Sequence, residues 1–258
     1  MTSFIVSPRT LAALALLVIA STITLPAQAW EWPIGSRVTG SGNLTRVQRS
    51  VQGFKGVALE VPANVEIVQG EAQGVTIETD DNIAALIETV VEKDQLKIRL
   101  AQRRAGIKPT SLKITVHART IESLAISGNG SFRAERLTSV SLAANISGSG
   151  DIWLRALDVD SLSLSISGSG DFTAGGRADT VRVNISGSGD VKTANLASRN
   201  VKLAISGSGD AKVWATEILT VSIAGVGDVG YYGDAALTQS VSGIGRINKL
   251  GTAPASGN

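Results

Sequence analysis

The feature that most constrains the fold is a six-residue motif, Ile-Ser-Gly-Ser-Gly-Asp, that recurs through the second half of the chain. Copies begin at Ile126, Ile146, Ile166, Ile185 and Ile205, and degenerate copies begin at Ile223 and Val241. Successive copies lie 18 to 20 residues apart. A unit of this length cannot bury an apolar face by itself, so the period predicts similar units stacked on one another.

Between the motifs, apolar and polar residues alternate, as in Leu162-Ser-Leu-Ser-Ile166 and Val181-Arg-Val-Asn-Ile185. Such alternation is typical of a strand with one buried face. An antiparallel meander would invert every second unit, whereas here every unit runs in the same direction. The sequence therefore predicts an all-β, single-stranded parallel β-helix (a β-solenoid) with about 20 residues per coil. Isoleucines would line its core and glycines would form a bend at one corner.

Residues 36–118 also alternate, but less regularly, and we interpret them as opening coils that cap the apolar end of the stack. Within them, Asp81-Asn82 and the following Ile83–Ile87 indicate a short helix or a turn. With the regular repeats of residues 119–250 they make one domain, residues 30–250, and residues 251–258 are expected to be a disordered tail.

Residues 1–29 have the pattern of a secretory signal peptide. Arg9 precedes an apolar run, Leu11–Ala20, and Pro26-Ala-Gln-Ala29 offers a cleavage site. The alternative is an uncleaved anchor, but this run is shorter than the roughly 20 residues that span a bilayer, and no second apolar span follows. We therefore expect export to the periplasm, the cell surface or the medium, and no transmembrane span after cleavage.

Composition excludes several functional classes. The chain has no cysteine, which rules out disulfides, a lipid-anchored cysteine and thiol chemistry. Its formal net charge is only +2, and no concentrated basic face of the kind that nucleic acid requires is evident. We expect no nucleic-acid partner.

Several segments resemble one known family. They are Gly40-Ser-Gly-Asn43, Gly53-Phe-Lys-Gly56, Val65-Glu-Ile-Val-Gln-Gly70 and the run of Ser-Gly-Ser-Gly-Asp units. Together they resemble the head GIN domain of putative auto-transporter adhesins, a bacterial family of unknown function, over roughly residues 36–250. The resemblance implies a right-handed parallel β-helix, exported or surface-associated in Gram-negative bacteria, and it supplies no catalytic residue.

The aspartates of the motif are the most suggestive polar feature. In a stack they would form a row, consisting of Asp151, Asp171, Asp190, Asp210 and Asp228. Carboxylates beside glycine-rich carbonyls could bind calcium ions, which would be the only cofactor. Alternatively each aspartate accepts hydrogen bonds from turn amides, as Asx residues commonly do. We favour turn capping, because calcium-binding repeats with facing turns have a much shorter period than this one.

Three further features bear on function. By alternation Trp153 points outward, where its indole could stack on a glycan or pack under a neighbouring segment. His117 is the only histidine, so no histidine pair exists for a metal site, and no acidic residue lies beside it for catalysis. Arg99, Arg103, Arg104 and Lys108 form a basic cluster that is either a solvated loop or a hidden site.

We therefore predict an exported, non-enzymatic β-solenoid that is adhesin-like or envelope-associated and binds a surface polysaccharide or an envelope protein. The alternatives are a polysaccharide-acting β-helix enzyme and a calcium-binding repeat protein. The enzyme is less favoured because such sites interrupt the repeat with long loops, whereas here the repeat continues from Ile126 to Val241.

Overall fold

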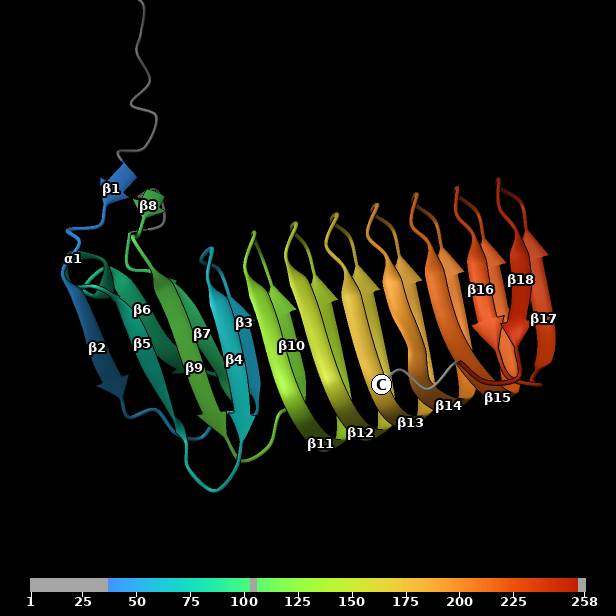
Figure 1. The fold of residues 1–258 in the computed structure, drawn as a ribbon, viewed down its shortest axis with the longest axis horizontal. Coiled ribbons are helices and arrows are strands. Elements are labelled where there is room, and N and C mark those ends of the chain that lie inside the picture. Colours follow the sequence, from blue (N-terminus) through green and yellow to red (C-terminus); the bar gives the residue numbers. More distant parts are fainter. Residues whose placement is uncertain (1–36, 103–105, 255–258) are drawn as a thin grey trace, which may run out of the picture. The chain divides into compact units, whose positions relative to one another are not determined.

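The computed structural model describes residues 37–102 and 106–254. The predicted signal peptide, residues 1–29, lies outside the described residues. The repeat region consists of strands that follow one another along the stack (Figure 1). They are β10 (Ser123–Ile126), β11 (Ser131–Ile146), β12 (Asp151–Ile166), β13 (Phe172–Ile185), β14 (Val191–Ile205), β15 (Ala211–Ile223), β16 (Val229–Tyr232), β17 (Ala236–Val241) and β18 (Ile247–Gly251).

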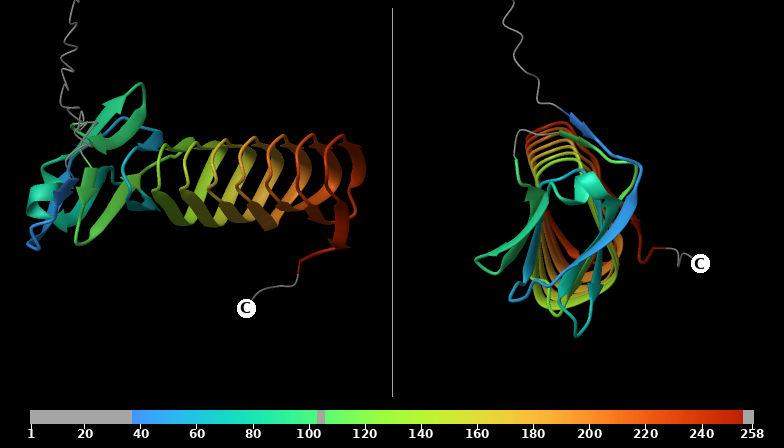
Figure 2. Two further views of the ribbon diagram at one scale, coloured as in Figure 1. Left: turned by 90° about the horizontal axis from the view of Figure 1, so that it is seen from above. Right: turned by 90° about the vertical axis from the view of Figure 1, so that its left-hand side faces the viewer.

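These strands pair in parallel, and the motif sets their register. Ile146 lies opposite both Ile126 and Ile166, and Ile185 lies opposite both Ile166 and Ile205. The same motif position therefore recurs at one place in every coil, as the superposed coils in Figure 2 show. The predicted fold class, a stacked β-solenoid with coils about 20 residues apart, is confirmed.

The interior of the coils is filled by apolar side chains. The isoleucines that open the motifs are buried, and so are the large residues that directly follow the motifs, such as Phe132, Ile152 and Phe172. Single residues between them, for example Trp153 and Thr173, are only partly covered. Burial thus alternates with the sequence, and the core is one continuous column through the stack.

From Gly148 onward, the glycines of the motif are required by close packing between coils rather than by unusual dihedral angles. A Cβ atom added to Gly168 would lie 1.8 Å from the carbonyl oxygen of Gly148, one coil below. Any side chain there would force neighbouring coils apart at the corner. The glycine ladder is therefore a contact between backbones.

The opening half contains nine strands and one short helix. They are β1 (Arg37–Thr39), β2 (Leu44–Arg49), β3 (Gly56–Leu59), β4 (Asn64–Gln69), β5 (Gly74–Asp80), α1 (Asp81–Ala84), β6 (Ile87–Glu92), β7 (Gln95–Leu100), β8 (Gly106–Lys108) and β9 (Leu112–Ala118). Strands β3 and β4 continue the solenoid, because β3 pairs in parallel with β10 and β4 pairs in parallel with β11.

Strands β7 and β9 also pair in parallel with β3 and β4, but part of this half differs from the opening coils that we expected. Strand β5 pairs antiparallel with both β2 and β9, and β6 pairs antiparallel with β7. The β6–β7 reversal is a two-residue turn in which Lys93 and Asp94 both have positive φ, of 51° and 61°. Such a turn matches the twist of an antiparallel hairpin. Alternation alone does not reveal strand direction, so the sequence indicated strands here but not their pairing.

Asp80 fixes the beginning of the described chain to this cap. Its carboxylate accepts the backbone amides of Gly42, at 2.8 Å, and Thr110, at 2.7 Å. Burial disfavours the charged form of Asp80, but the hydrogen bonds from Thr110 and Gly42 outweigh burial and hold the pKa of this carboxyl below its ordinary value. The fully buried carboxylate therefore joins two segments that are distant in sequence.

At the other end, Gly251 is the last residue of β18, and residues 252–254 continue from it. These four residues belong to the segment that we expected to be a disordered tail. Residues 255–258 lie outside the described part of the chain.

Candidate functional site

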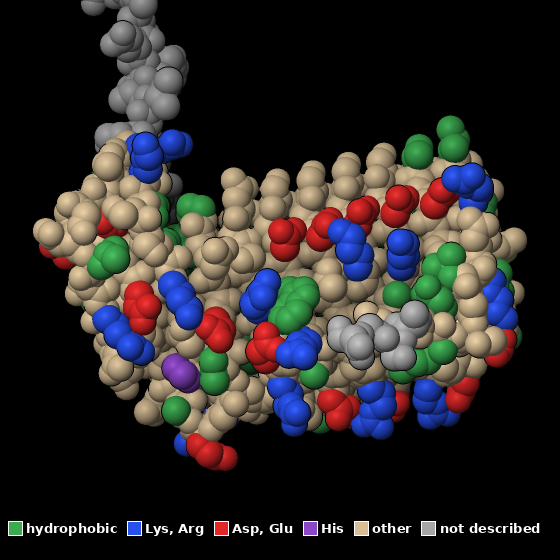
Figure 3. All heavy atoms as spheres, in the orientation of Figure 1, with side chains coloured by type: hydrophobic (Ala, Val, Ile, Leu, Met, Phe, Trp, Pro, Cys, Tyr) green, Lys and Arg blue, Asp and Glu red, His purple; other side chains and the backbone are tan. Residues whose placement is uncertain are grey.

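The five aspartates of the motif form a row along one corner of the solenoid, visible as acidic side chains crossing the coils in Figure 3. Each Oδ1 accepts the backbone amide of the equivalent residue in the next coil. The amides of Asp171, Asp190, Asp210, Asp228 and Arg246 lie 2.8, 3.0, 3.0, 2.7 and 2.9 Å from the preceding carboxylates. Hydrogen bonds from turn amides to the aspartates are what the turn-capping interpretation expects. Each carboxylate, however, caps the turn of the next coil rather than its own turn.

Two cations lie on this row. Lys192 Nζ lies 2.5 Å from Asp171 Oδ2 and 4.0 Å from Asp190 Oδ2. The Nη2 atom of Arg246 lies 2.6 Å from Asp228 Oδ2. Burial favours the neutral form of Asp171, but hydrogen bonds from Lys192 and the Asp190 amide outweigh it and lower the pKa of Asp171. The side chain and the amide of Arg246 likewise lower the pKa of Asp228. Lys192 and Arg246 therefore partly neutralise the charge of the row.

The calcium interpretation gains no geometric support. In residues 37–102 and 106–254, no three carboxylate, thiol or imidazole side chains lie together in a way that could hold a metal ion. The row supplies one carboxylate per coil, and Oδ1 of each is already used by an amide. Calcium binding by these aspartates stays the less favoured alternative to turn capping, and a direct titration distinguishes the two.

A second row runs beside the aspartates, two residues further along each strand. The strand register places these residues opposite one another in the order Glu66, Arg133, Trp153, Thr173, Lys192 and Lys212. The guanidinium carbon of Arg133 lies 4.5 Å from the centre of the Trp153 ring, which is a cation–π contact. Trp153 is half-buried and points outward from β12. We call residues 66, 133, 153, 173, 192 and 212 the Trp153 row.

At one end of the Trp153 row the surface is hollowed over β4. The hollow has a volume of about 530 Å³ and is lined by polar groups from three strands, including Asn64, Glu66, Lys113, Ser131 and Arg133. Lys113 pairs with Glu66 at 3.3 Å, and the Ser131 hydroxyl donates to Asn64 Oδ1 at 2.8 Å. The sequence analysis missed this groove, because it forms only where β4 lies between β9 and β11.

The other candidate residues from the sequence analysis do not belong to the aspartate row or to the Trp153 row. His117, in β9, is half-buried and lines a different hollow beside Arg49 and Gln73. Arg99 donates to Glu88 at 2.8 Å and lies 3.4 Å from Glu92, so it is held in ion pairs on the β6–β7 hairpin. Lys108 ends β8, while Arg103 and Arg104 lie outside the described residues.

Trp214 is half-buried in β15. Its Nε1 atom is buried without a hydrogen-bond partner among the described residues. Within the described residues, no helix is long and apolar enough to span a bilayer.

The fold and its surface define a class of protein, a parallel β-solenoid whose outward side chains form rows across stacked coils. A family model described as "Putative auto-transporter adhesin, head GIN domain" matches residues 53–235, and the chain belongs to this family. The resemblance found in the sequence is thus confirmed. A search of curated proteins found no match.

Solved structures agree with this assignment. A putative adhesin from Bacteroides fragilis is 25% identical with a TM-score of 0.79, over 83% of this chain and 100% of that one. A putative lipid binding protein from Parabacteroides distasonis is 26% identical with a TM-score of 0.70 over the same shares. A putative adhesin from the same species, 22% identical with a TM-score of 0.66 over 83% of this chain and all of that one, shows the shared fold.

Proposed function

We propose that this protein is exported and acts, without catalysis, as a binding or structural component of the bacterial envelope. Its ligand would be a surface polysaccharide, held along the Trp153 row and the groove over β4. The observation that carries the proposal is the Arg133–Trp153 stack, which places an indole and a guanidinium together on an outward face beside a polar groove. Membership of a family whose description names adhesins supports the same role.

The chemistry of this face suits a carbohydrate. Aromatic rings stack on the apolar faces of sugars, while carboxylates, amides and guanidinium groups bond their hydroxyls. On one side the neighbour of Trp153 in the row is Arg133, and on the other it is Thr173, which has a short side chain. Asn64, Glu66 and Lys113 then supply polar groups in the groove that continues from the stack.

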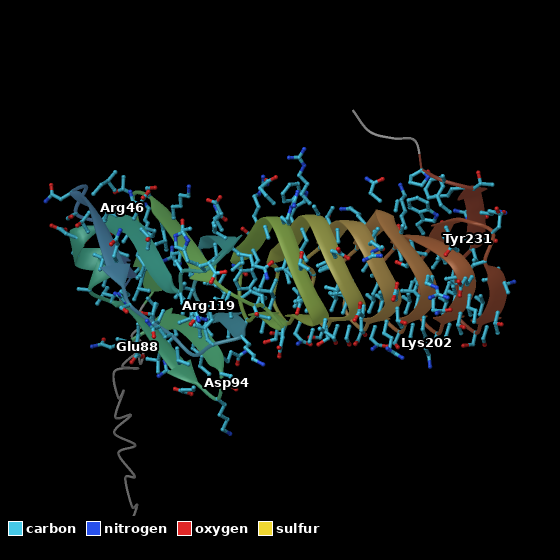
Figure 4. All side chains as sticks on the ribbon, turned by 90° about the horizontal axis from the view of Figure 1, so that it is seen from below. Arg46, Glu88, Asp94, Arg119, Lys202 and Tyr231 are labelled. Atoms are coloured by element: carbon cyan, nitrogen blue, oxygen red, sulfur yellow. The ribbon has the colours of Figure 1, made fainter. Side chains whose placement is uncertain are left out.

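Binding to purified bacterial polysaccharides tests the proposal. Trp153→Ala should lose most of the affinity of the unaltered protein, because it removes the stacking surface. Lys202→Ala is the matched control, since Lys202 is exposed on a different stretch of the coils, in β14 (Figure 4). Equal binding by both variants, or no binding by the unaltered protein to any envelope polysaccharide, would overturn this role for Trp153.

The non-enzymatic part of the proposal needs its own assay. The aspartates of the row already accept hydrogen bonds from backbone amides. From β11 to β14, no long loop interrupts the coils to bring further acidic residues together. Incubating the protein with acidic and neutral polysaccharides at high protein concentration should release no oligosaccharide. Release that depends on Glu66 or Lys113 would instead identify the groove as an enzyme site.

Cell fractionation tests export. We expect the protein in the periplasm or at the cell surface, with the first 29 residues removed. Recovery in the periplasm alone would favour a structural or sensing role over adhesion, whereas recovery in the cytoplasm with an intact N-terminus would contradict export.

A further inference from the structure

The last coil of the solenoid has an open edge. We call β17, the following turn and β18, residues 236–251, the terminal coil. Strand β17 pairs with β15 and β18 pairs with β16, and among the described residues no strand lies on their other side. A strand edge of this kind leaves amide and carbonyl groups that can pair with another chain.

Apolar side chains gather at this end. Eight large apolar side chains are exposed in the described chain, and five of them belong to the last coils, namely Ile218, Val226, Val241, Ile244 and Leu250. Val226 and Ile244 occupy the turn-tip position that is Ser149, Ser169, Ser188 and Ser208 in the earlier copies, and they are bridged to each other. Serine is thus replaced by an apolar residue only in the two copies beside the open edge.

Most of the terminal coil lacks the charges that normally protect a free edge. Residues 235–245 contain no Asp, Glu, Lys or Arg, and no proline. The two cations of the terminal coil are both held in ion pairs, because Arg246 pairs with Asp228 and Lys249 pairs with Asp234, each at 2.6 Å. Natural edge strands are usually blunted by charges or prolines, so this edge is suited to an interface.

The opposite end of the solenoid does not share these properties. Strand β2 carries Arg46 and Arg49, and Arg46 pairs with Glu78 at the surface (Figure 4). Head-to-tail stacking would therefore place unlike surfaces against each other, one of them charged. At the terminal coil, residues 252–254 leave from the side of the coil and do not cross its edge (Figure 2).

We propose that the terminal coil binds the terminal coil of a second copy of this chain, end to end, about a twofold axis. Two identical coils share the same outline and strand spacing, and a twofold axis makes their edge strands antiparallel, so that the open backbone groups can pair. Residues 235–245 carry no charge, so this part of the edge brings no like charges together when it meets its copy. Val226, Val241 and Ile244 of both copies would be buried at the contact.

The oligomeric state of the full exported protein, measured by sedimentation equilibrium, is the first test. We expect dimers, and we expect the double variant Val226→Ser, Ile244→Ser to raise the dimer dissociation constant by roughly tenfold or more. These substitutions restore the serine of the earlier copies, so the turn should still fold, which an unchanged circular dichroism spectrum would verify. Val140→Ser is the control, because Val140 is 75% exposed but lies on β11, far along the stack.

The absence of cysteine from the chain allows a second test that locates the contact. Ser240→Cys and Ile244→Cys, each as a single cysteine, should form disulfide-linked dimers on mild oxidation, and Val140→Cys should not. A protein that stays monomeric throughout, larger assemblies that grow with concentration, or crosslinking by Val140→Cys alone would overturn the proposal. It would also be overturned if the monomer bound lipid vesicles through Val226 and Ile244 instead. None of these outcomes depends on polysaccharide binding.

Discussion

The carboxylate of Asp190 accepts the backbone amide of Asp210 at 3.0 Å, although the two residues lie 20 positions apart in the chain. The same bond recurs from coil to coil, so each aspartate ties its own turn to the next one. The row would otherwise be costly, because neighbouring carboxylates about 4.8 Å apart repel by roughly 1 kcal/mol even in water. Amide caps, Lys192 and Arg246 offset that repulsion.

Substitution of Asp190 separates its capping role from its charge. Asp190→Ala removes the acceptor and should lower the free energy of unfolding by about 1 kcal/mol. Asp190→Asn keeps an acceptor oxygen and removes one repulsive charge, so it should be at least as stable as the unaltered protein. Denaturant midpoints measure both, with Asp160→Ala as a control, since Asp160 is exposed and outside the row. If Asp190→Asn were as damaging as Asp190→Ala, the capping account would fail.

Calcium should not bind the aspartate row. Isothermal titration of the protein with calcium is expected to give no heat, and the melting temperature should not change, because Oδ1 of each aspartate is engaged by an amide. Heat release that disappears in Asp190→Asn would instead show that the row binds cations.

The acid sensitivity of the fold should depend on Asp80. Its folded-state pKa is lowered, so the folded protein binds fewer protons than the unfolded chain, and the resulting stability is present above the unfolded pKa of about 4. It is lost as the pH falls through the lower folded pKa. Asp171 and Asp228 act in the same direction.

Urea unfolding at a series of pH values measures this effect. Stability should be level near neutral pH and should fall below about pH 4. Asp80→Asn should be less stable at neutral pH and should lose less on acidification, whereas Asp160→Asn should follow the unaltered protein. An unchanged acid dependence in Asp80→Asn would show that other carboxylates are responsible.

A methyl group in the glycine ladder should destabilise the stack. Gly168→Ala places a carbon 1.8 Å from the Gly148 carbonyl oxygen, and the strain should cost about 3 kcal/mol. Gly70→Ala is the matched control, because nothing lies within 4 Å of its added carbon. Thermal melting of the two variants compares them directly, and similar melting temperatures would refute close backbone packing at the corner.

Much of the repeat region could be predicted because its information is local and repeated. The period places Ile146 on Ile166 in any stack, and alternation then decides that Phe172 is buried and that Trp153 faces outward. The aspartates fall in one row for the same reason. Even so, the sequence did not show that each carboxylate bonds to the amide of the next coil, because that depends on how neighbouring turns are offset.

Without a repeat, pairing depends on contacts that no local pattern specifies. In the opening half, β5 alternates like any other strand, yet it pairs antiparallel with β2 and β9, and the groove over β4 exists only because Glu66 and Arg133 become neighbours. The sequence by itself thus determined the solenoid, its core and its outward rows, since a fixed period repeats one local choice many times. Only the tertiary structure decided the antiparallel cap, the polar groove and the open terminal edge, because strand direction and end contacts are set by the packing of distant segments.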